Sequence, residues 1–145
     1  VVLGAATQEK LFGVLDLKAV SDSLIVTTDD GTSGVRGRVT DVLAEVITKN
    51  NSQAVYACGP MPMLAAVAKM SQANGAFSQC AVEESMACGI GVCMTCVLPI
   101  IGDDGVTRMA RSCVDGPVFR GDRVRWDDVD TIPSDVFGAP QPGGH

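Results

Sequence analysis

Short apolar runs alternate with stretches of helical periodicity along the first 82 residues of the chain. The apolar runs are bounded by turn signals such as Asp29-Asp30-Gly31, which is typical of buried strands. Strands are expected at residues 1–5, 23–28, 53–58 and 77–82. Helices are expected between them at residues 8–18, 41–50 and 61–73. Strands that alternate with helices favour a parallel sheet, so the pattern predicts an α/β fold.

Local signals set the expected faces and ends of the helices. Phe12 and Leu15 share one side of the first helix, which is expected to be its apolar face. Thr40 is expected to cap the second helix, because a hydroxyl at this place accepts a hydrogen bond from a free amide. Asn74-Gly75 is expected to end the third helix, since glycine adopts the left-handed conformation at helix ends.

The second half of the chain is expected to form a small cysteine-rich module. Strand-like segments at residues 95–101 and 106–112 are joined by the turn Gly102-Asp-Asp-Gly105. Residues from 133 onward are rich in Pro and Gly and are expected to be disordered. The predicted organisation is therefore an α/β part at 1–82, the cysteine module at 83–130 and a disordered tail at 131–145.

Composition is that of a packed protein from a reducing compartment. The chain has 145 residues, is 46% hydrophobic and has a formal net charge of −6 at pH 7. This length suits one ordinary domain, or a partial domain with a small module. We find no secretory signal and no apolar run long enough to span a bilayer. A cytoplasmic protein without membrane contact is therefore expected.

Positive charge is sparse, apart from a group of arginines near the last cysteines. The 11 Lys and Arg residues are outnumbered by 17 Asp and Glu residues. They form no stripe that would follow a phosphate backbone, so no nucleic-acid partner is expected. The grouped arginines are expected to form a solvated face that could steer an acidic partner. They are Arg108, Arg111, Arg120, Arg123 and Arg125.

The ends of three predicted strands suggest a ligand site, because parallel α/β sheets bind ligands beyond the carboxyl ends of their strands. Gly4-Ala-Ala-Thr7 follows the first strand. The candidate cofactor-binding residues are Thr28, Asp29 and Gly31 after the second strand and Cys58, Gly59 and Pro60 after the third. Glycine lets a ligand approach the backbone, and amides at the start of the next helix favour a negative group. Each segment also looks like an ordinary connection, and Cys58 alone is more often a small core residue than a reactive one.

Four of the six cysteines follow the spacing C-x4-C-x2-C with a distant fourth. They are Cys88, Cys93, Cys96 and Cys113. This is the thiolate pattern of a plant-type 2Fe-2S cluster, which takes four cysteine ligands. Gly89 and Gly91 permit the tight bend that such a loop needs, and amides within the loop are expected to donate to the sulfurs. The spacing therefore predicts a 2Fe-2S site.

Two other uses of four cysteines stay open. Structural zinc also takes four cysteines, but its ligands usually come as two C-x2–4-C pairs, and this chain has one such pair and a lone fourth cysteine. A disulfide framework suits short secreted chains, whereas this chain is long and rich in Ala and Val. Colour separates the first alternative from the cluster, because an oxidised 2Fe-2S protein is red-brown and a zinc protein is colourless.

Three longer segments carry a resemblance to a known family. They are Tyr56-Ala-Cys-Gly-Pro-Met-Pro-Met-Leu64, Met86-Ala-Cys-Gly-Ile-Gly-Val-Cys93 and Ser112-Cys-Val-Asp-Gly-Pro-Val-Phe119. With them the chain, from Val1 to about Trp126, resembles the electron transfer subunits of NAD-linked (type B) dihydroorotate dehydrogenase. That family is similar to the ferredoxin-NADP reductases, with a flavin-binding barrel, a pyridine-nucleotide domain and a C-terminal cluster module.

The resemblance assigns roles to motif residues and shows what differs. It implies cluster ligation by the four cysteines and a Cys58-Gly59-Pro60 turn near the nicotinamide and the flavin. The flavin barrel and the glycine-rich first β-α turn of the family are expected upstream of Val1, so the chain resembles the C-terminal half of a subunit. Many relatives of the reductase superfamily have a phosphate-binding arginine at the position of Ala6, and its absence favours NAD over NADP.

The resemblance also implies an electron path. Dihydroorotate would reduce FMN in a separate catalytic subunit, the 2Fe-2S cluster would relay single electrons, and FAD in the other half would reduce NAD, in pyrimidine biosynthesis. No residue of this chain needs to act as a general base, and the half-subunit alone is expected to be inactive. The alternatives are a related subunit of a ferredoxin-NADP transhydrogenase or sulfide dehydrogenase, some of which have a non-cysteine first ligand, and a zinc-bound structural module.

Overall fold

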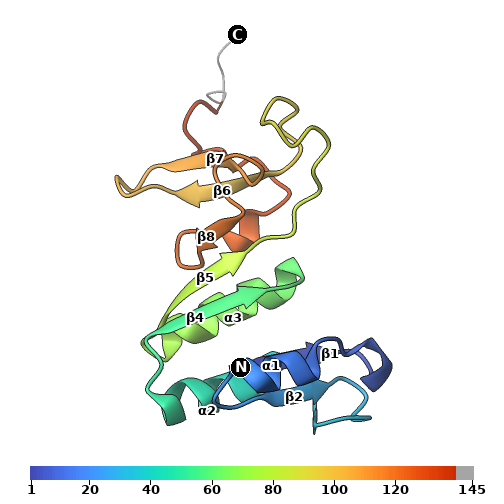
Figure 1. Cartoon of the computed structure of the whole chain (residues 1–145). Helices are drawn as coiled ribbons and strands as arrows, with labels where there is room; N and C mark the ends of the chain where they lie inside the picture. The colour runs from blue at the N-terminus through green and yellow to red at the C-terminus, as the bar shows by residue number, and fades with distance from the viewer. Residues whose placement is uncertain (140–145) are drawn as a thin grey trace. The chain divides into compact units, whose positions relative to one another are not determined.

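The computed structural model describes residues 1–139 and divides into two compact units, Val1–Asn51 and a second that begins at Ser52. Both units combine helices with a small sheet, so the predicted α/β class is confirmed (Figure 1). The strands of the expected sheet lie in two separate sheets, one in each unit.

The first unit contains a parallel sheet in the order β1-β2-β3. Its strands are β1 (Val2–Ala5), β2 (Ile25–Thr28) and β3 (Val35–Arg36). In the register of β1 and β2, Ala5 lies opposite Thr28, so the two strands end at the same edge. The expected turn follows β2, where the Gly31 amide donates to the Thr28 carbonyl at 3.1 Å and Gly31 has a φ of 77°. β3 is only two residues long, and its sequence carries no strand pattern.

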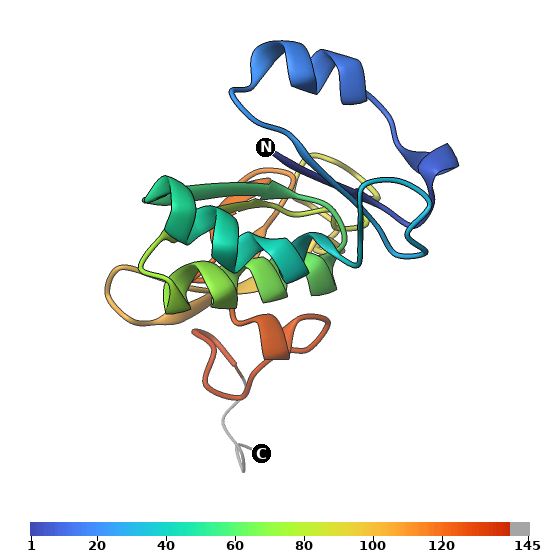
Figure 2. The ribbon, with the colours of Figure 1, turned by 90° about the horizontal axis from the view of Figure 1, so that it is seen from below.

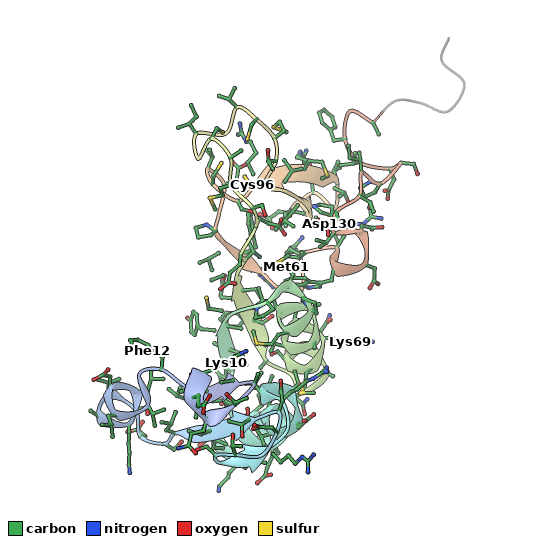
Figure 3. The ribbon with its side chains drawn as sticks, turned by 90° about the vertical axis from the view of Figure 1, so that its right-hand side faces the viewer. Lys10, Phe12, Met61, Lys69, Cys96 and Asp130 are labelled. Carbon is green, nitrogen blue, oxygen red and sulfur yellow. The ribbon has the colours of Figure 1, made fainter. Side chains whose placement is uncertain are left out.

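The expected helix at residues 8–18 is wrong in its bounds and in its buried face. The segment forms a short 3-10 helix, η1 (Gln8–Lys10), and a separate helix, α1 (Val14–Val20). Gly13 precedes α1 with a φ of 71°, a conformation that interrupts a continuous helix. No residue of α1 is buried, and Phe12 and Leu15 are 89% and 80% exposed. Figure 2 shows η1 and α1 as separate helices along the chain, and Figure 3 labels Phe12. The apolar residues recur at helical spacing, but nothing among residues 1–139 covers Phe12 or Leu15.

The second predicted helix forms with a different cap. α2 (Val39–Asn50) begins before Thr40, so Thr40 lies inside the first turn rather than at the cap. The cap is Arg38, whose amide donates to the Asp41 carboxylate at 2.7 Å. Leu43 and Ile47 are the buried residues of the helix. α2 packs close to β1 because Gly4 has no side chain: a Cβ there would lie 2.4 Å from Val39 Cγ1.

The second unit begins with the strand, helix and strand that the sequence predicts. β4 (Ala54–Cys58) and β5 (Phe77–Ala81) are parallel, and α3 (Met61–Ala73) connects them. α3 has the predicted bounds, buries Leu64 and Val67, and is followed by Gly75 with a φ of 75°. β4 is not the buried strand that was expected, because Tyr56 is 78% exposed.

The cysteine module packs on this sheet. β6 (Val97–Ile101) and β7 (Thr107–Arg111) form the expected hairpin, and β8 (Val118–Arg120), which the sequence does not predict, pairs antiparallel with β5. One core joins α3, β5, the hairpin and β8 through Leu64, Cys80, Leu98 and Phe119. Cys80 is fully buried and is thus a packing residue, as expected.

The structure bears on two parts of the predicted organisation. The compact units divide between residues 51 and 52, and the predicted boundary at 82/83 lies inside the second unit and its shared core, so that boundary stays a prediction. Part of the expected disordered tail is held in place: the Phe137 amide donates to the Thr107 carbonyl at 2.8 Å, and Asp135 pairs with Arg125 at 2.7 Å. Residues 140–145 lie outside the described residues.

Among residues 1–139, no helix has the length and apolar character needed to cross a membrane.

Candidate metal centre

A loop without regular secondary structure carries three of the four predicted ligands. It runs from β5 to β6 and includes Cys88, Cys93 and Cys96. The chain curls there through positive φ angles at Gly89 (67°) and Gly91 (78°), which glycine adopts without a steric penalty. Gly91 also lies close to the turn after β7, since a Cβ there would be 2.7 Å from Val114 Cγ2.

Hydrogen-bond donors within the loop point at two sulfurs. The amides of Cys93 and Ile90 donate to Cys88 Sγ at 3.5 and 3.4 Å, and these bonds lower the pKa of the Cys88 thiol to about 6. The Thr95 hydroxyl donates to Cys93 Sγ at 3.1 Å and lowers the pKa of that thiol. Amide donation inside the loop was expected from the sequence and is confirmed for Ile90. Both thiols are thus biased toward the thiolate, the form that binds metals.

The hairpin register brings the fourth cysteine to the loop. Val97 lies opposite Arg111, so Cys96 at the start of β6 lies beside Ser112 at the end of β7. The amide and hydroxyl of Ser112 both donate to the Cys96 carbonyl, at 2.9 and 3.0 Å. The next residue is Cys113, whose pKa is raised chiefly by a hydrogen bond with the Cys96 thiol. Two residues far apart in sequence thus become neighbours through the hairpin register. Figure 3 labels Cys96.

The hydrogen bond from the Cys93 amide to Cys88 Sγ brings these two residues together, and the hairpin register brings the turn of Cys113 beside Cys96, so the four cysteines are grouped as two thiol pairs, Cys88 with Cys93 and Cys96 with Cys113. All are free thiols. Within residues 1–139, no three Cys, His, Asp or Glu side chains are grouped so as to hold one metal ion. A tetrahedral zinc site needs four ligands around a single ion, whereas a 2Fe-2S cluster distributes four thiolates over two irons. Two pairs, the first of which has donors aimed at its sulfurs, fit a 2Fe-2S cluster, which takes four thiolates over two irons.

The first group of predicted cofactor residues lies in the first unit. Thr28 is fully buried, and its hydroxyl is already used: it donates to the Ser33 carbonyl at 2.7 Å and accepts from the Ser33 amide at 3.1 Å. Asp29 is exposed, and its amide donates to the Ala5 carbonyl at 3.2 Å. Gly31 closes the turn. Of these residues, only the exposed Asp29 side chain is free for a ligand.

The second group lies in the second unit, beyond the end of β4. Cys58 is exposed, and its thiol lies 3.8 Å from Glu83 Oε1. Gly59 has a φ of 147°, and a Cβ there would meet only the flexible end of Met63. Pro60 is the N-terminal cap of α3. The two predicted groups thus belong to different compact units.

The arginines near the cysteines, which were expected to form a solvated face that could steer an acidic partner, are partly exposed but paired. Each of the five pairs with an aspartate, at 2.6–3.3 Å. Their positive charge is locally balanced, which weakens any long-range steering. Sequence reasoning also missed Ser112 and Thr95 as neighbours of the cysteines. Each is a hydroxyl residue next to a cysteine of the motif in the sequence, and that position could have indicated a contact near the cysteines.

Known proteins are similar in sequence to this chain. Residues 83–125 match the family described as the iron-sulfur cluster binding domain of dihydroorotate dehydrogenase B. A probable electron transfer subunit of dihydroorotate dehydrogenase B (NAD(+)) from Methanopyrus kandleri is 36% identical over 140 residues, which cover 97% of this chain and 50% of that protein. A subunit of the same name from Caldanaerobacter subterraneus subsp. tengcongensis is 42% identical over 101 residues, covering 70% of this chain and 40% of that protein.

A solved structure is similar in fold. It comes from work on flavin-based electron bifurcation by an NADH-dependent reduced ferredoxin-NADP oxidoreductase, and it matches with a TM-score of 0.72 and 32% identity over 88% of this chain and 44% of that one. The chain spans about half the length of the curated relatives it matches. Residues 83–125 therefore belong to the iron-sulfur cluster binding domain family of dihydroorotate dehydrogenase B, and the chain as a whole is a homologue of about half of an electron transfer subunit of that enzyme.

Proposed function

We propose that the chain is the cluster-bearing half of an electron transfer subunit of NAD-linked dihydroorotate dehydrogenase, an oxidoreductase of pyrimidine biosynthesis. In this role it transfers electrons between FMN of a dihydroorotate-oxidising subunit and NAD, with FAD bound mainly by the other half of the subunit. The single observation that carries the proposal is the pairing of four free cysteines in a segment that matches the cluster-binding family. The half-subunit alone is expected to be inactive toward dihydroorotate and NAD.

The proposed ligands are the two thiol pairs. Cys88 and Cys93 would hold one iron, and Cys96 and Cys113 the other. A bound 2Fe-2S cluster supplies reversible one-electron transfer. The protein contributes charge stabilisation, because the Ile90 and Cys93 amides and the Thr95 hydroxyl donate to sulfur and favour the thiolate form.

The strand ends are proposed as nucleotide contacts. Cys58, Gly59 and Pro60 form an exposed turn at the start of α3, and the φ of Gly59 keeps its backbone open to a ligand. In the first unit, Asp29 and the Gly31 turn are the proposed contacts, while the Thr28 hydroxyl has a structural role in closing the loop. Neutral Ala6 at the end of β1 supports NAD rather than NADP.

The cluster loop supports an interface with the dihydroorotate-oxidising subunit. Ile90 and Val92, which lie between the cysteines, are 73% and 74% exposed, and Met94 is half exposed. Exposed apolar side chains at a redox site suit a dry contact that shortens the path to a second redox centre and keeps water away. Hence the loop, rather than the paired arginines, is the proposed partner surface.

Iron content tests the proposed site. Anaerobically purified chain is expected to contain about two irons per chain, as the cluster type requires. Cys93→Ser should lose most of the iron and the red-brown colour, because it removes one thiolate of the first pair. The control is Cys58→Ser, which replaces an exposed cysteine outside the two pairs. Stoichiometric zinc in the anaerobic protein, with no iron uptake on reconstitution, would instead support the zinc-bound structural module.

A charge on the loop tests the partner surface. In the full subunit, Ile90→Asp is expected to leave the iron content unchanged and to weaken association with the dihydroorotate-oxidising subunit by tenfold or more, about 1.4 kcal/mol. Phe12→Asp is the matched control, since Phe12 is also exposed and apolar but lies outside the cluster loop. Unchanged association and unchanged electron transfer from dihydroorotate to NAD in Ile90→Asp would contradict the interface.

The structural match favours one second candidate. A fold shared at 32% identity with a chain from a reduced ferredoxin-NADP oxidoreductase supports a related transhydrogenase subunit. The two functions differ in the electron donor, so reduction of the cluster in the assembled complex by dihydroorotate, or instead by NADPH or reduced ferredoxin, separates them.

A further inference from the structure

The two parts of the ligand set must be held together across a large sequence distance. Cys88 and Cys93 lie on the loop, whereas Cys113 lies on the turn after β7. Ser112 connects Cys96 to this turn through its two hydrogen bonds to the Cys96 carbonyl. These two bonds act at Cys96. They do not hold the first thiol pair, Cys88 and Cys93, which lies earlier in the loop. A second contact joins this pair to the turn.

Arg111 makes the second contact. Its Nη1 donates to the Gly91 carbonyl at 3.4 Å, and Gly91 lies between Cys88 and Cys93. The guanidinium also packs over Gly91, because a Cβ there would be 3.3 Å from Nη1 and 3.5 Å from Cδ. Arg111 thus contacts Gly91, the residue whose positive φ allows the loop to curl.

Asp115 fixes the direction of this side chain. Its carboxylate accepts from the Arg111 amide at 2.8 Å and from Arg111 Nε at 3.3 Å, while the Asp115 amide donates to the Arg111 carbonyl at 2.7 Å. These bonds close the turn that carries Cys113 and orient the guanidinium toward Gly91. Arg111 donates from Nε to Asp115 on the turn and from Nη1 to Gly91 on the loop. A lysine ammonium has a single nitrogen and cannot reproduce this pair of contacts.

The exposure of the ion pair shows which part of this arrangement matters. The side chains of Arg111 and Asp115 are 38% and 39% exposed, and an ion pair this accessible adds little stability by attraction alone. Geometry is the more important contribution, because the same residue connects two segments that each carry ligands.

We propose that Arg111 is a positioning residue that docks the Cys88–Cys93 part of the loop onto the turn of Cys113 and so sets the spacing between the two thiol pairs. The inference rests on the proposed function, since it concerns the four cysteines as one ligand set. It adds a contact with the loop to an arginine that was expected only to belong to a solvated face.

The test uses the full chain and two readouts. The first is hydrogen exchange of residues 88–93 in metal-free protein, which Arg111→Gln should accelerate because the loop loses its anchor. The second is the rate of colour loss when EDTA is added to the iron-loaded chain. Arg111→Gln should lose the cluster about two- to tenfold faster, the factor that corresponds to one net hydrogen bond. The rate for Arg111→Lys should lie between those of wild type and Arg111→Gln, because lysine keeps the positive charge but lacks the planar guanidinium.

Arg108→Gln is the matched control. Arg108 lies on the same strand and also pairs with an aspartate four residues away, Asp104, but contacts neither the loop nor the cysteine turn. Equal exchange and equal colour loss in wild type, Arg111→Gln and Arg108→Gln would overturn the proposal. If Arg111→Gln does not fold, Asp115→Asn is tested with the same readouts. This variant keeps the Arg111 side chain but removes the carboxylate charge that orients it. A wild-type chain that binds no iron would refute the proposed function, while the exchange experiment would still decide the role of Arg111.

Discussion

Hydrogen bonding to sulfur distinguishes the two thiol pairs. Cys88 and Cys93 lie in the exposed loop and accept bonds from amides and a hydroxyl, whereas Cys96 is buried and held through its carbonyl by Ser112. Donors at sulfur stabilise added negative charge and therefore tune reduction potential. The loop thus supplies donors to the first pair, and the hairpin places the second pair, of which Cys96 is buried and Cys113 is half-buried.

Asp104 at the hairpin turn gives a pH prediction. A bidentate hydrogen bond from Arg108, with a further bond from the Val106 amide, holds the pKa of the Asp104 carboxyl well below its usual range. A group with a depressed folded-state pKa stabilises the protein above its unfolded pKa of about 4 and loses that contribution as the pH falls toward the folded value. Asp104→Asn should therefore lower Tm slightly at pH 7, and the difference from wild type should shrink below about pH 4.

Salt and a second aspartate provide the controls for this prediction. Because the pair is half exposed, added salt should also reduce the Tm difference. Asp22→Asn changes an exposed carboxylate that takes part in no ion pair among residues 1–139, and its effect should not vary in this way. A Tm difference for Asp104→Asn that is constant from pH 7 to pH 2 would contradict the assignment.

At the scale of elements, buried contacts decide which apolar residues matter. Leu98 in β6 is fully buried in the core that joins α3, β5 and β8, whereas Leu15 in α1 is 80% exposed. Leu98→Ala should lower the free energy of unfolding by about 2–5 kcal/mol through lost burial and a cavity. Leu15→Ala should change it by less than about 0.5 kcal/mol. Urea unfolding of both variants tests this, and a comparable loss in the two would mean that α1 is packed in solution.

At the scale of the molecule, all four proposed ligands and the core that supports them lie in the second unit. This core includes Leu64 and Cys80 from the α/β segment together with Leu98 and Phe119 from the cysteine module. A piece that starts at residue 52 should therefore fold and take up as much iron per chain as the full chain. A piece that starts at 83 should not, because it lacks α3 and β5. Circular dichroism and iron analysis of both pieces test this, and equal iron uptake by the shorter piece would favour an independent module from residue 83.

Local signals in the sequence were sufficient for several elements and for the cysteines. α3 has the predicted bounds because its apolar residues, the preceding Pro60 and the following Asn74-Gly75 all act within the segment. The hairpin β6-β7 was predictable for the same reason, since Gly102 and Gly105 mark its turn. The spacing of the cysteines indicates their chemistry, because the size of a cluster constrains the loop that would hold it.

Tertiary structure alone decided the features that depend on distant partners. The periodicity of residues 8–18 could not show that Phe12 and Leu15 are exposed, and the two-residue β3 and the three-residue β8 exist only through pairing with β2 and β5. The sequence by itself determined the type and spacing of the cysteines. The hairpin register determined that Cys113 lies beside Cys96, and the fold brings Arg111 into contact with both Asp115 and Gly91. Contacts between segments far apart in the chain leave no local pattern in the sequence.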